Sequence, residues 1–279
     1  MKTTSLRIAS ILTAAVIGLL APEIAHARTS GDPGGHTRKG VAFAKDKDYG
    51  KAVEEFTQAI EAQPKDAKNY QNRGTAYKLM GKWKEAEDDF TKVIELKPKD
   101  ADAYTDRGQV LLRTKKLDDA IADFDRALAL EPKDISARRF RAYAFVQKKD
   151  WNRAVADYSA IIERKPDDVQ ALERRGFAYR NLKKYKEAID DFSKVVEKTP
   201  TDPEAYRRRA FAYAMTNQAE KEAEDQRVIL KLAPNDQAAQ KRLKGLERKL
   251  AAAVPAQTAA RPGAQAPGPT MTPAASPKP

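Results

Sequence analysis

The apolar positions between residues 67 and 100 follow a helical period twice, with a turn at residues 80–82 between the two runs. The first run places its apolar or small residues at i, i+4 and i+7, which is the spacing of one helix face. These residues are Tyr70, Gly74 and Tyr77. The second stripe consists of Trp83, Ala86 and Phe90. The segment is therefore predicted to fold as a helix–turn–helix hairpin.

A proline recurs every 34 residues along most of the chain, and an aspartate follows each proline two positions later. The prolines are Pro64, Pro98, Pro132, Pro166, Pro200 and Pro234, and the aspartates are Asp66, Asp100, Asp134, Asp168, Asp202 and Asp236. Proline ends a helix, and aspartate is favoured as the N-cap of the next one. A fixed period of this length indicates a solenoid, in which each unit buries its apolar face only against its neighbours. The predicted units are 33–66, 67–100, 101–134, 135–168, 169–202 and 203–236.

Each unit also keeps a small residue where its two helices are expected to approach closely. In the first helices these residues are Gly40, Gly74, Gly108, Ala142, Gly176 and Ala210, and in the second helices they are Ala52, Ala86, Ala120, Ala154 and Ala188. The large residue four positions after each of these alanines is Phe56, Phe90, Phe124, Tyr158 or Phe192. In the sixth unit Glu222 and Gln226 stand where alanine and phenylalanine are expected. Its second helix is therefore predicted to be looser or shifted in register.

The combination of Gly, Tyr, Ala, Phe and Pro in a 34-residue unit resembles the tetratricopeptide repeat (TPR) family over residues 33–236. The resemblance implies an all-α, right-handed superhelical solenoid of six helix–turn–helix repeats. Residues 237–250 carry Leu243, Leu246 and Leu250 on one stripe. They are predicted to form the C-terminal capping helix that a solenoid needs.

The two ends of the chain are predicted to lie outside the repeats. Residues 1–27 combine the basic Lys2 and Arg7, an apolar run, and Ala25-His26-Ala27, as in a signal peptide cleaved after Ala27. We expect export to the periplasm with no stable membrane insertion after cleavage; an uncleaved anchor is the alternative. Residues 28–32 are predicted to be a linker. Residues 251–279, rich in alanine and proline, are predicted to be a disordered tail, either a solvated tail or a wall-spanning or partner-docking segment.

Charge modifies this picture in two ways. The net charge is +12, which favours anionic partners or surfaces without identifying them. In addition, a basic and an acidic residue both recur with the repeat. The basic residues are Lys39, Arg73, Arg107, Arg141, Arg175 and Arg209, and the acidic ones are Glu55, Asp89, Asp123, Asp157, Asp191 and Asp225. We interpret these rows as structural ion pairs rather than a phosphate-binding row. Whether each pair forms within a unit or with the preceding unit stays open.

In TPR proteins the second, fifth, ninth and twelfth residues of the first helices line a concave groove, so the resemblance implies that a peptide would lie there. In the fourth to sixth units the candidate peptide-binding residues are Arg139, Tyr143, Phe177, Arg180, Arg207 and Phe211. No acid recurs with them, and arginine beside aromatic rings suits an acidic peptide with aromatic or apolar anchors. Asp102 and Asp106 predict a polar or mildly acidic N-terminal end. A solvated helix face is the alternative.

The chain offers few residues for catalysis. It contains no cysteine and two histidines, of which only His36 follows the predicted signal. Nucleophilic triads, Cys/His pairs and multi-histidine metal sites therefore lack their residues. We predict no enzymatic activity, no cofactor and no metal.

The leading hypothesis is a periplasmic protein–protein interaction scaffold that binds a peptide or partner protein in its groove. The resemblance suggests roles such as envelope or secretion-system assembly, without choosing among them. Adhesion of the basic C-terminal half to an anionic surface or polymer is the alternative. The export signal and the constant repeat length argue against nucleic-acid reading by helical repeats.

Overall fold

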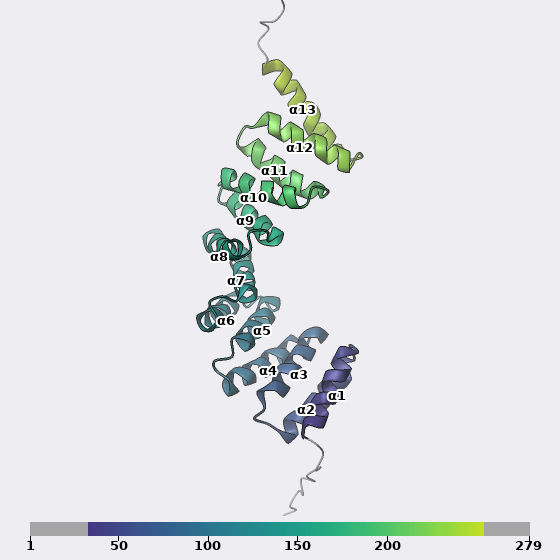
Figure 1. The fold of residues 1–279 in the computed structure, drawn as a ribbon, viewed down its shortest axis with the longest axis vertical. Helices are drawn as coiled ribbons and strands as arrows, with labels where there is room; N and C mark the ends of the chain where they lie inside the picture. Colours follow the sequence, from purple (N-terminus) through teal and green to yellow (C-terminus); the bar gives the residue numbers. More distant parts are fainter. Residues whose placement is uncertain (1–32, 254–279) are drawn as a thin grey trace, which may run out of the picture.

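The computed structural model describes residues 33–253, which form thirteen α-helices and no strand. The helices are α1 (Pro33–Lys45), α2 (Tyr49–Ala62), α3 (Ala67–Met80), α4 (Trp83–Leu96), α5 (Ala101–Arg113), α6 (Leu117–Leu130), α7 (Ile135–Gln147), α8 (Trp151–Arg164), α9 (Val169–Asn181), α10 (Tyr185–Lys198), α11 (Pro203–Met215), α12 (Ala219–Leu232) and α13 (Gln237–Ala253). Each helix packs mainly on its neighbours in the chain, so the helix pairs stack along one axis (Figure 1).

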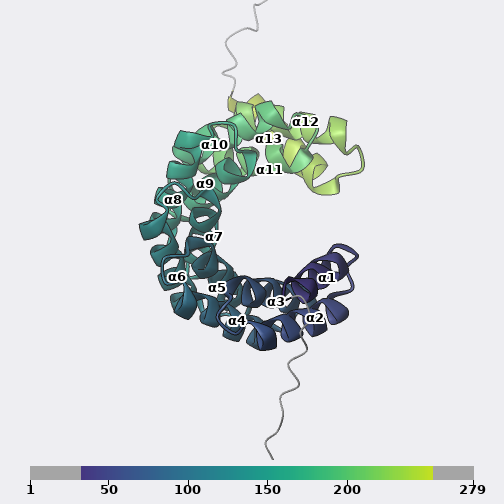
Figure 2. The ribbon, with the colours of Figure 1, turned by 60° about the horizontal axis from the view of Figure 1, so that its bottom comes forward.

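The stack curves into an open ring (Figure 2). Helices α3, α5, α7, α9 and α11, the first helices of successive repeats, form its inner wall, and their partners α4, α6, α8 and α10 lie outside. The all-α solenoid predicted from the repeat is confirmed. The inner wall is consequently built from one helix of every hairpin, so that residues 34 positions apart in the sequence become neighbours along it.

The periodic aspartates cap the first helices as predicted. Asp66 accepts a hydrogen bond from the Lys68 amide at 3.0 Å, and Asp168 accepts one from the Ala171 amide at 2.9 Å. Such a cap satisfies an amide that the first turn of a helix leaves without a partner, and stabilises the helix by about 1 kcal/mol. The same aspartates thus fix where each repeat begins.

Close contact between the two helices of a repeat depends on the small residues that the sequence places there. A Cβ atom built on Gly108 would lie 2.6 Å from Cε1 and 2.8 Å from Cζ of Phe124, which is too close for any side chain without movement of the ring. Phe56, Phe90, Phe124 and Phe192 are completely or almost completely buried. Each such ring contributes about 1.5–3 kcal/mol through its removal from water. Each ring turns the edge that carries Cε1 toward the first helix.

The recurring arginines form what we call the arginine ladder, namely Arg73, Arg107, Arg141, Arg175 and Arg209. Each donates from Nε and Nη2 to both carboxylate oxygens of the aspartate sixteen residues later, at 2.6–3.0 Å. The pairs therefore form within a repeat, which answers the question that the sequence leaves open. Burial raises the pKa of Asp191, and the hydrogen bonds from Arg175 oppose that shift.

Each ladder arginine also joins two repeats. Its Nη1 atom donates to the second helix of the preceding repeat, for example to Thr57 from Arg73 at 3.0 Å and to Ser159 from Arg175 at 3.0 Å. In the first repeat the pattern changes, because Glu55 pairs with Nδ1 of His36 at 2.7 Å. The structural interpretation of the two charged rows thus agrees with the observed contacts.

The sixth repeat corrects one expectation. Helix α12 keeps the register of the other second helices, because Asp225 still accepts both hydrogen bonds from Arg209. The buried Glu222 is accommodated in place of an alanine because Arg242 of α13 donates to both of its carboxylate oxygens. Helix α13 runs to Ala253, three residues beyond the predicted end of the capping helix.

The predicted signal peptide (1–27), the linker (28–32) and residues 254–279 of the predicted tail lie outside the described residues. None of the helices between residues 33 and 253 combines the length and the apolar composition that crossing a membrane requires.

Candidate functional site

The six candidate groove residues fall into two neighbouring hollows on the inner wall. Arg139 and Tyr143 line the first, a hollow of ≈ 860 Å³ that we call the central hollow. Phe177, Arg180, Arg207 and Phe211 line the second, a hollow of ≈ 500 Å³ that we call the C-terminal hollow. Arg174 lines both and therefore connects them.

The central hollow combines apolar and basic side chains drawn from four repeats. Its apolar lining includes Trp83, Leu112 and Tyr143, and Tyr143 is 41% exposed. Its charged lining residues are all basic: Lys78, Arg113, Lys115, Arg139 and Arg174. Because none of the described residues that line it is acidic, the hollow is an electrostatically favourable place for an anion.

Two of these cations pair with acidic side chains, and the other three have no such pair in the part of the chain that the structure describes. Lys78 donates to Asp106 at 2.5 Å, and Arg139 donates to both carboxylate oxygens of Asp168 at 2.5 and 3.3 Å. Arg113 stacks over the Trp83 ring at 5.3 Å from its centroid. Among residues 33–253, Arg174 has no ion pair or hydrogen bond to an acid. Arg113 and Arg174 are thus available to a ligand.

The C-terminal hollow is organised by stacking. The guanidinium of Arg180 lies 4.7 Å from the Phe177 ring centroid and 5.3 Å from that of Phe211, so both rings hold it. The edge of Trp151 meets Phe177 at a centroid distance of 5.8 Å. Cation–π contacts fix the guanidinium without neutralising it. The hydrogen-bonding atoms of Arg180 consequently stay open to an anionic group, while Phe211, 46% exposed, offers an apolar surface.

The structure overturns one premise of the sequence prediction. Arg139 and Arg207 do have acidic partners: Arg139 pairs with Asp168, which caps α9, and Arg207 pairs with Asp236, which caps α13. The hydrogen bonds from Arg139 and the Ala171 amide hold the pKa of Asp168 below its ordinary value, against the opposing effect of burial. These two arginines therefore help to hold the first helix of their own repeat against the N-terminus of the helix that follows the repeat.

The two aspartates predicted at the N-terminal end of the groove, Asp102 and Asp106, lie in different surroundings. Gln71 and Lys78 both donate to the carboxylate of Asp106, at 2.6 and 2.5 Å. The hollow between the first two repeats, ≈ 280 Å³, is lined mainly by apolar groups such as Val41, Tyr49 and Leu79. Partial removal of the Asp102 carboxyl from water raises its pKa, and the nearby charges of Asp100, Asp106 and Asp134 raise it further.

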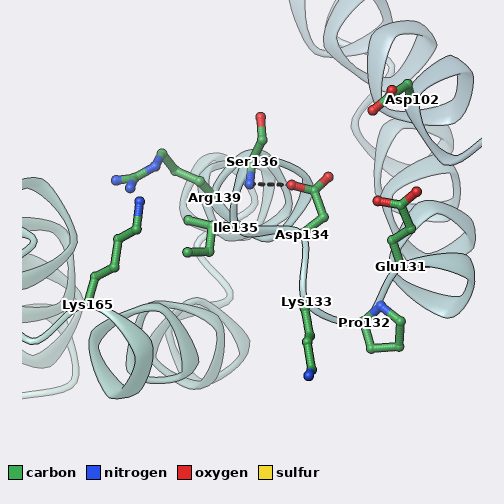
Figure 3. Close-up of a pocket in the computed structure, with 9 residues that line it drawn as sticks. All are labelled: Asp102, Glu131, Pro132, Lys133, Asp134, Ile135, Ser136, Arg139 and Lys165. Atoms are coloured by element: carbon green, nitrogen blue, oxygen red, sulfur yellow. Dashed lines mark hydrogen bonds between the residues drawn. The ribbon is translucent and has the colours of Figure 1, made fainter.

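A further hollow of ≈ 820 Å³ lies at the loop between the third and fourth repeats (Figure 3). Its two sides carry opposite charges, with Arg139 and Lys165 on one side and Asp102 and Glu131 on the other. Between them, the Ser136 amide donates to Asp134 at 2.7 Å, as the N-cap requires. Since its charges balance, this hollow is a weaker candidate for an anion than the central one.

Sequence reasoning missed several residues of the central hollow. Trp83 and Arg113 lie at the ends of their helices, next to the turn within each repeat, and so fall outside the positions that the resemblance assigns to a groove. Tyr158 comes from an outer helix, yet it lines the hollow. The one available signal for Tyr158 was its hydroxyl at a position where the other repeats have phenylalanine.

Together these features define a helical-repeat protein whose inner wall carries a basic, aromatic groove. Sequence models described as Tetratricopeptide repeat match residues 35–66, 55–88, 72–135 and 141–203, which together span more than half of the 279 residues. The chain belongs to the tetratricopeptide repeat family. No curated protein matches the sequence significantly.

Several solved structures share the fold. The crystal structure of YrrB, described as a TPR protein with an unusual peptide-binding site, has a TM-score of 0.61 at 23% identity and covers 69% of this chain and 99% of its own. MamA from Desulfovibrio magneticus RS-1 has a TM-score of 0.57 at 20% identity, covering 61% of this chain and 97% of its own. A tetratricopeptide repeat protein from Parabacteroides merdae ATCC 43184 has a TM-score of 0.52 at 21% identity. The match covers 76% of this chain and 83% of that protein's chain.

Proposed function

We propose that this protein is a non-enzymatic interaction scaffold that holds an extended segment of a partner protein along its inner wall. The observation that carries the proposal is the pair of adjoining hollows, in which exposed aromatic side chains lie beside Arg174 and Arg180, two arginines that have no acidic partner within the described part of the chain. Tyr143 and Phe211 are 41% and 46% exposed, and large apolar side chains that gather on one surface mark binding sites. The resemblance of the fold to YrrB, a TPR protein with a peptide-binding site, supports the same use of the groove.

The charges of the groove define the partner's chemistry. Arg174 and Arg180 would pair with carboxylates, which guanidinium groups bind through two parallel hydrogen bonds. Phe177, Phe211 and Tyr143 would contact apolar or aromatic side chains next to those carboxylates. The proposed partner segment is therefore acidic, with apolar anchors.

We also propose that the protein acts in the periplasm, on the basis of the signal-peptide pattern in residues 1–27. Cell fractionation followed by mass spectrometry of the N-terminus tests this directly. A mature protein that begins at Arg28 and occurs in the periplasmic fraction is expected. A full-length chain in the cytosolic fraction would exclude export.

The groove assignment is tested with a defined probe. The full chain is titrated against a fluorescein-labelled pool of octapeptides that contain fixed Asp and Phe residues, at low and at moderate salt. The Phe177→Ala/Phe211→Ala double variant should lose at least about tenfold in affinity, since two aromatic contacts are removed. Leu232→Ala is the matched control, because it truncates a side chain of similar exposure outside the groove. Unchanged binding by the double variant, while it remains folded, would exclude the groove.

Adhesion to an anionic surface is a second candidate, favoured by the charges of α13. Lys241, Lys244, Arg248 and Lys249 are all exposed on this helix. Contact with a polyanion weakens steeply as salt is added, whereas an apolar anchor in a hollow is much less sensitive. Binding to anionic vesicles that falls with salt and with Lys244→Gln/Arg248→Gln, but not with Phe177→Ala/Phe211→Ala, would favour adhesion over the peptide groove.

A further inference from the structure

We infer that the central hollow is a subsite for one side-chain carboxylate of the bound peptide, received jointly by the hydroxyl of Tyr158 and the guanidinium of Arg174. The inference rests on the proposed peptide-binding function and names the group that the peptide must present at this point of the groove.

The position of Tyr158 is unusual because a hydroxyl occupies a place where four other repeats have only a ring. Phe56, Phe90, Phe124 and Phe192 stand at the corresponding positions. The rings of Phe56, Phe124 and Phe192 bring Cε1 and Cζ toward the first helix of the repeat; in Phe124 the Cζ atom lies 2.8 Å from where a Cβ atom on Gly108 would be. A hydroxyl on Cζ therefore extends toward the inner wall, and Tyr158 does line the central hollow although its side chain is almost fully buried.

The hydroxyl of Tyr158 has no hydrogen-bond partner among residues 33–253. Three other side-chain atoms of the described residues lack a partner and are fully shielded from solvent, namely Gln71 Oε1, Asn72 Nδ2 and Thr105 Oγ1. The Tyr158 hydroxyl is not one of them, so it remains accessible from the hollow. A polar group at the base of a hollow loses part of its hydration, and this loss is offset only when a ligand accepts its hydrogen bond. Phenylalanine would avoid the loss altogether, so the hydroxyl points to a ligand with an acceptor.

The surroundings of the hydroxyl select an anionic acceptor. Burial raises the pKa of Tyr158 to about 12, with Arg174 and Arg139 opposing the shift. The hydroxyl therefore remains a neutral donor at physiological pH and does not repel an anion. Arg174 is exposed and has no acid of its own among the described residues, and every charged residue that lines the hollow is basic. A hydroxyl and a guanidinium together provide charge-assisted hydrogen bonds to a carboxylate.

The place of the hollow in the stack favours a side-chain carboxylate over a chain terminus. Its lining residues come from the second to the fifth of six repeats, so the groove continues on both sides of it. An extended peptide that passes through would present a side chain there. Residues 254–279 of this chain are an unsuitable occupant, because their charged side chains, Arg261 and Lys278, are both basic.

The experiment compares two octapeptide pools, amidated at the C-terminus, that differ only in Asp or Asn at one fixed central position. Fluorescence anisotropy is measured with the full chain, with Tyr158→Phe and with Arg174→Gln. Tyr158→Phe restores the residue that four other repeats carry, so folding should be preserved. Tyr206→Phe is the matched control, because it removes a hydroxyl that donates to the Pro200 carbonyl at 3.2 Å.

The wild type and Tyr206→Phe are expected to prefer the Asp pool by roughly five- to tenfold, as for a hydrogen bond to a charged group. Tyr158→Phe and Arg174→Gln should each reduce that preference to about twofold or less. Equal binding of both pools by the wild type, or a preference that survives Tyr158→Phe, would overturn the subsite. A third pool carries Asn at the fixed position and a free C-terminal carboxylate. If it bound more strongly than the amidated Asp pool, the side-chain assignment would be overturned.

The same measurements separate this inference from the function on which it rests. If both pools bind equally but Phe177→Ala/Phe211→Ala still abolishes binding, the groove stands and only the carboxylate subsite fails. If neither pool binds the wild type, the proposed function and the subsite fail together. Competition by inorganic phosphate at concentrations at which acetate has no effect would make the hollow a phosphate site and exclude the carboxylate.

Discussion

The fifteenth residue of each repeat adopts a left-handed backbone conformation in the turn between the two helices. Gly81 has φ 74°, and the corresponding residues Lys47, Lys115, Lys149, Lys183 and Asn217 have φ between 55° and 62°. Residues with a Cβ atom are strained in this region, asparagine less than most, whereas glycine is not. Five of the six turns therefore retain a small local strain.

Replacement of Lys183 by glycine should relieve that strain. The free energy of unfolding is expected to rise by about 0.5–1 kcal/mol, because the strain removed exceeds the extra entropy that glycine has in the unfolded chain. Asn217→Gly should have a smaller effect, since asparagine tolerates the conformation better. Urea unfolding followed by circular dichroism measures both. A loss of stability in Lys183→Gly would contradict the explanation.

The raised pKa of Tyr158 makes a separate prediction at alkaline pH. The folded protein holds this proton to a pKa of about 12, compared with the ordinary value of 10.0. The tighter binding of this proton in the folded state therefore contributes fully to the free energy of unfolding below about pH 10, and the contribution is lost as the pH rises through 12. Between these limits the wild type should lose more stability than Tyr158→Phe, which has no such proton. Parallel losses in the two proteins, measured by urea unfolding, would argue against the shift.

At the scale of single helices, α13 completes the fold by covering α12. Ala219 and Ala223 of α12 pack with Leu246, and the partly buried Leu243 and Leu250 join them. Glu222 lies in the same interface with its side chain only 4% exposed, and Arg242 is its partner. Glu222, one of the two residues that depart from the repeat pattern in α12, thus adapts this helix to a cap rather than to another repeat.

Removal of Arg242 should weaken this interface more than removal of the whole pair. Arg242→Ala leaves a buried carboxylate without its hydrogen bonds, and we expect a loss of about 1.5–3 kcal/mol. Glu222→Ala restores the alanine of the other repeats, so adding Arg242→Ala to it should cost little. A double-mutant cycle in urea unfolding gives the coupling. Losses that simply add would mean that the pair contributes nothing.

How far the sequence predicts these elements depends on whether the information lies within one repeat. The hairpins, the aspartate caps and the close contact of Gly108 with Phe124 follow from positions that recur at a fixed offset. The pairing of Arg139 with Asp168 is not evident from spacing, although both residues belong to one unit, because it depends on how closely a first helix approaches the N-terminus of the helix that follows the repeat. Tyr158 lies on the outer helix α8 and still lines the central hollow. Its contact with the hollow depends on how closely the two helices of the hairpin pack, which residue spacing alone does not specify.

Over the whole molecule, contacts run between neighbouring repeats, so stability should be transmitted along the stack in one dimension. A lesion at one end is therefore expected to remain local, whereas one in the middle affects both sides. Phe56→Ala removes a buried ring from the first repeat, and Phe124→Ala removes the equivalent ring from the third.

Amide hydrogen exchange followed by mass spectrometry compares the two variants. Phe56→Ala should increase exchange mainly in α1–α4 and leave the C-terminal hollow protected. Phe124→Ala should increase exchange from α3 to α8 and weaken peptide binding as well. Uniformly increased exchange throughout the chain in Phe56→Ala would indicate that the repeats unfold as a single cooperative unit.

The contacts of the arginine ladder are alike at successive repeats, so one whole repeat can be removed or added without changing the kind of contact at the junction. If residues 101–134 were excised, Asp100 would cap the helix that begins at Ile135, and Arg141 would face Thr91, the hydroxyl that Arg107 now contacts at 3.2 Å. The new joint would use the same kinds of atoms as the old one. Unequal recombination between repeats can thus shorten or lengthen the protein in whole steps, altering the reach of the binding surface while each junction keeps its chemistry.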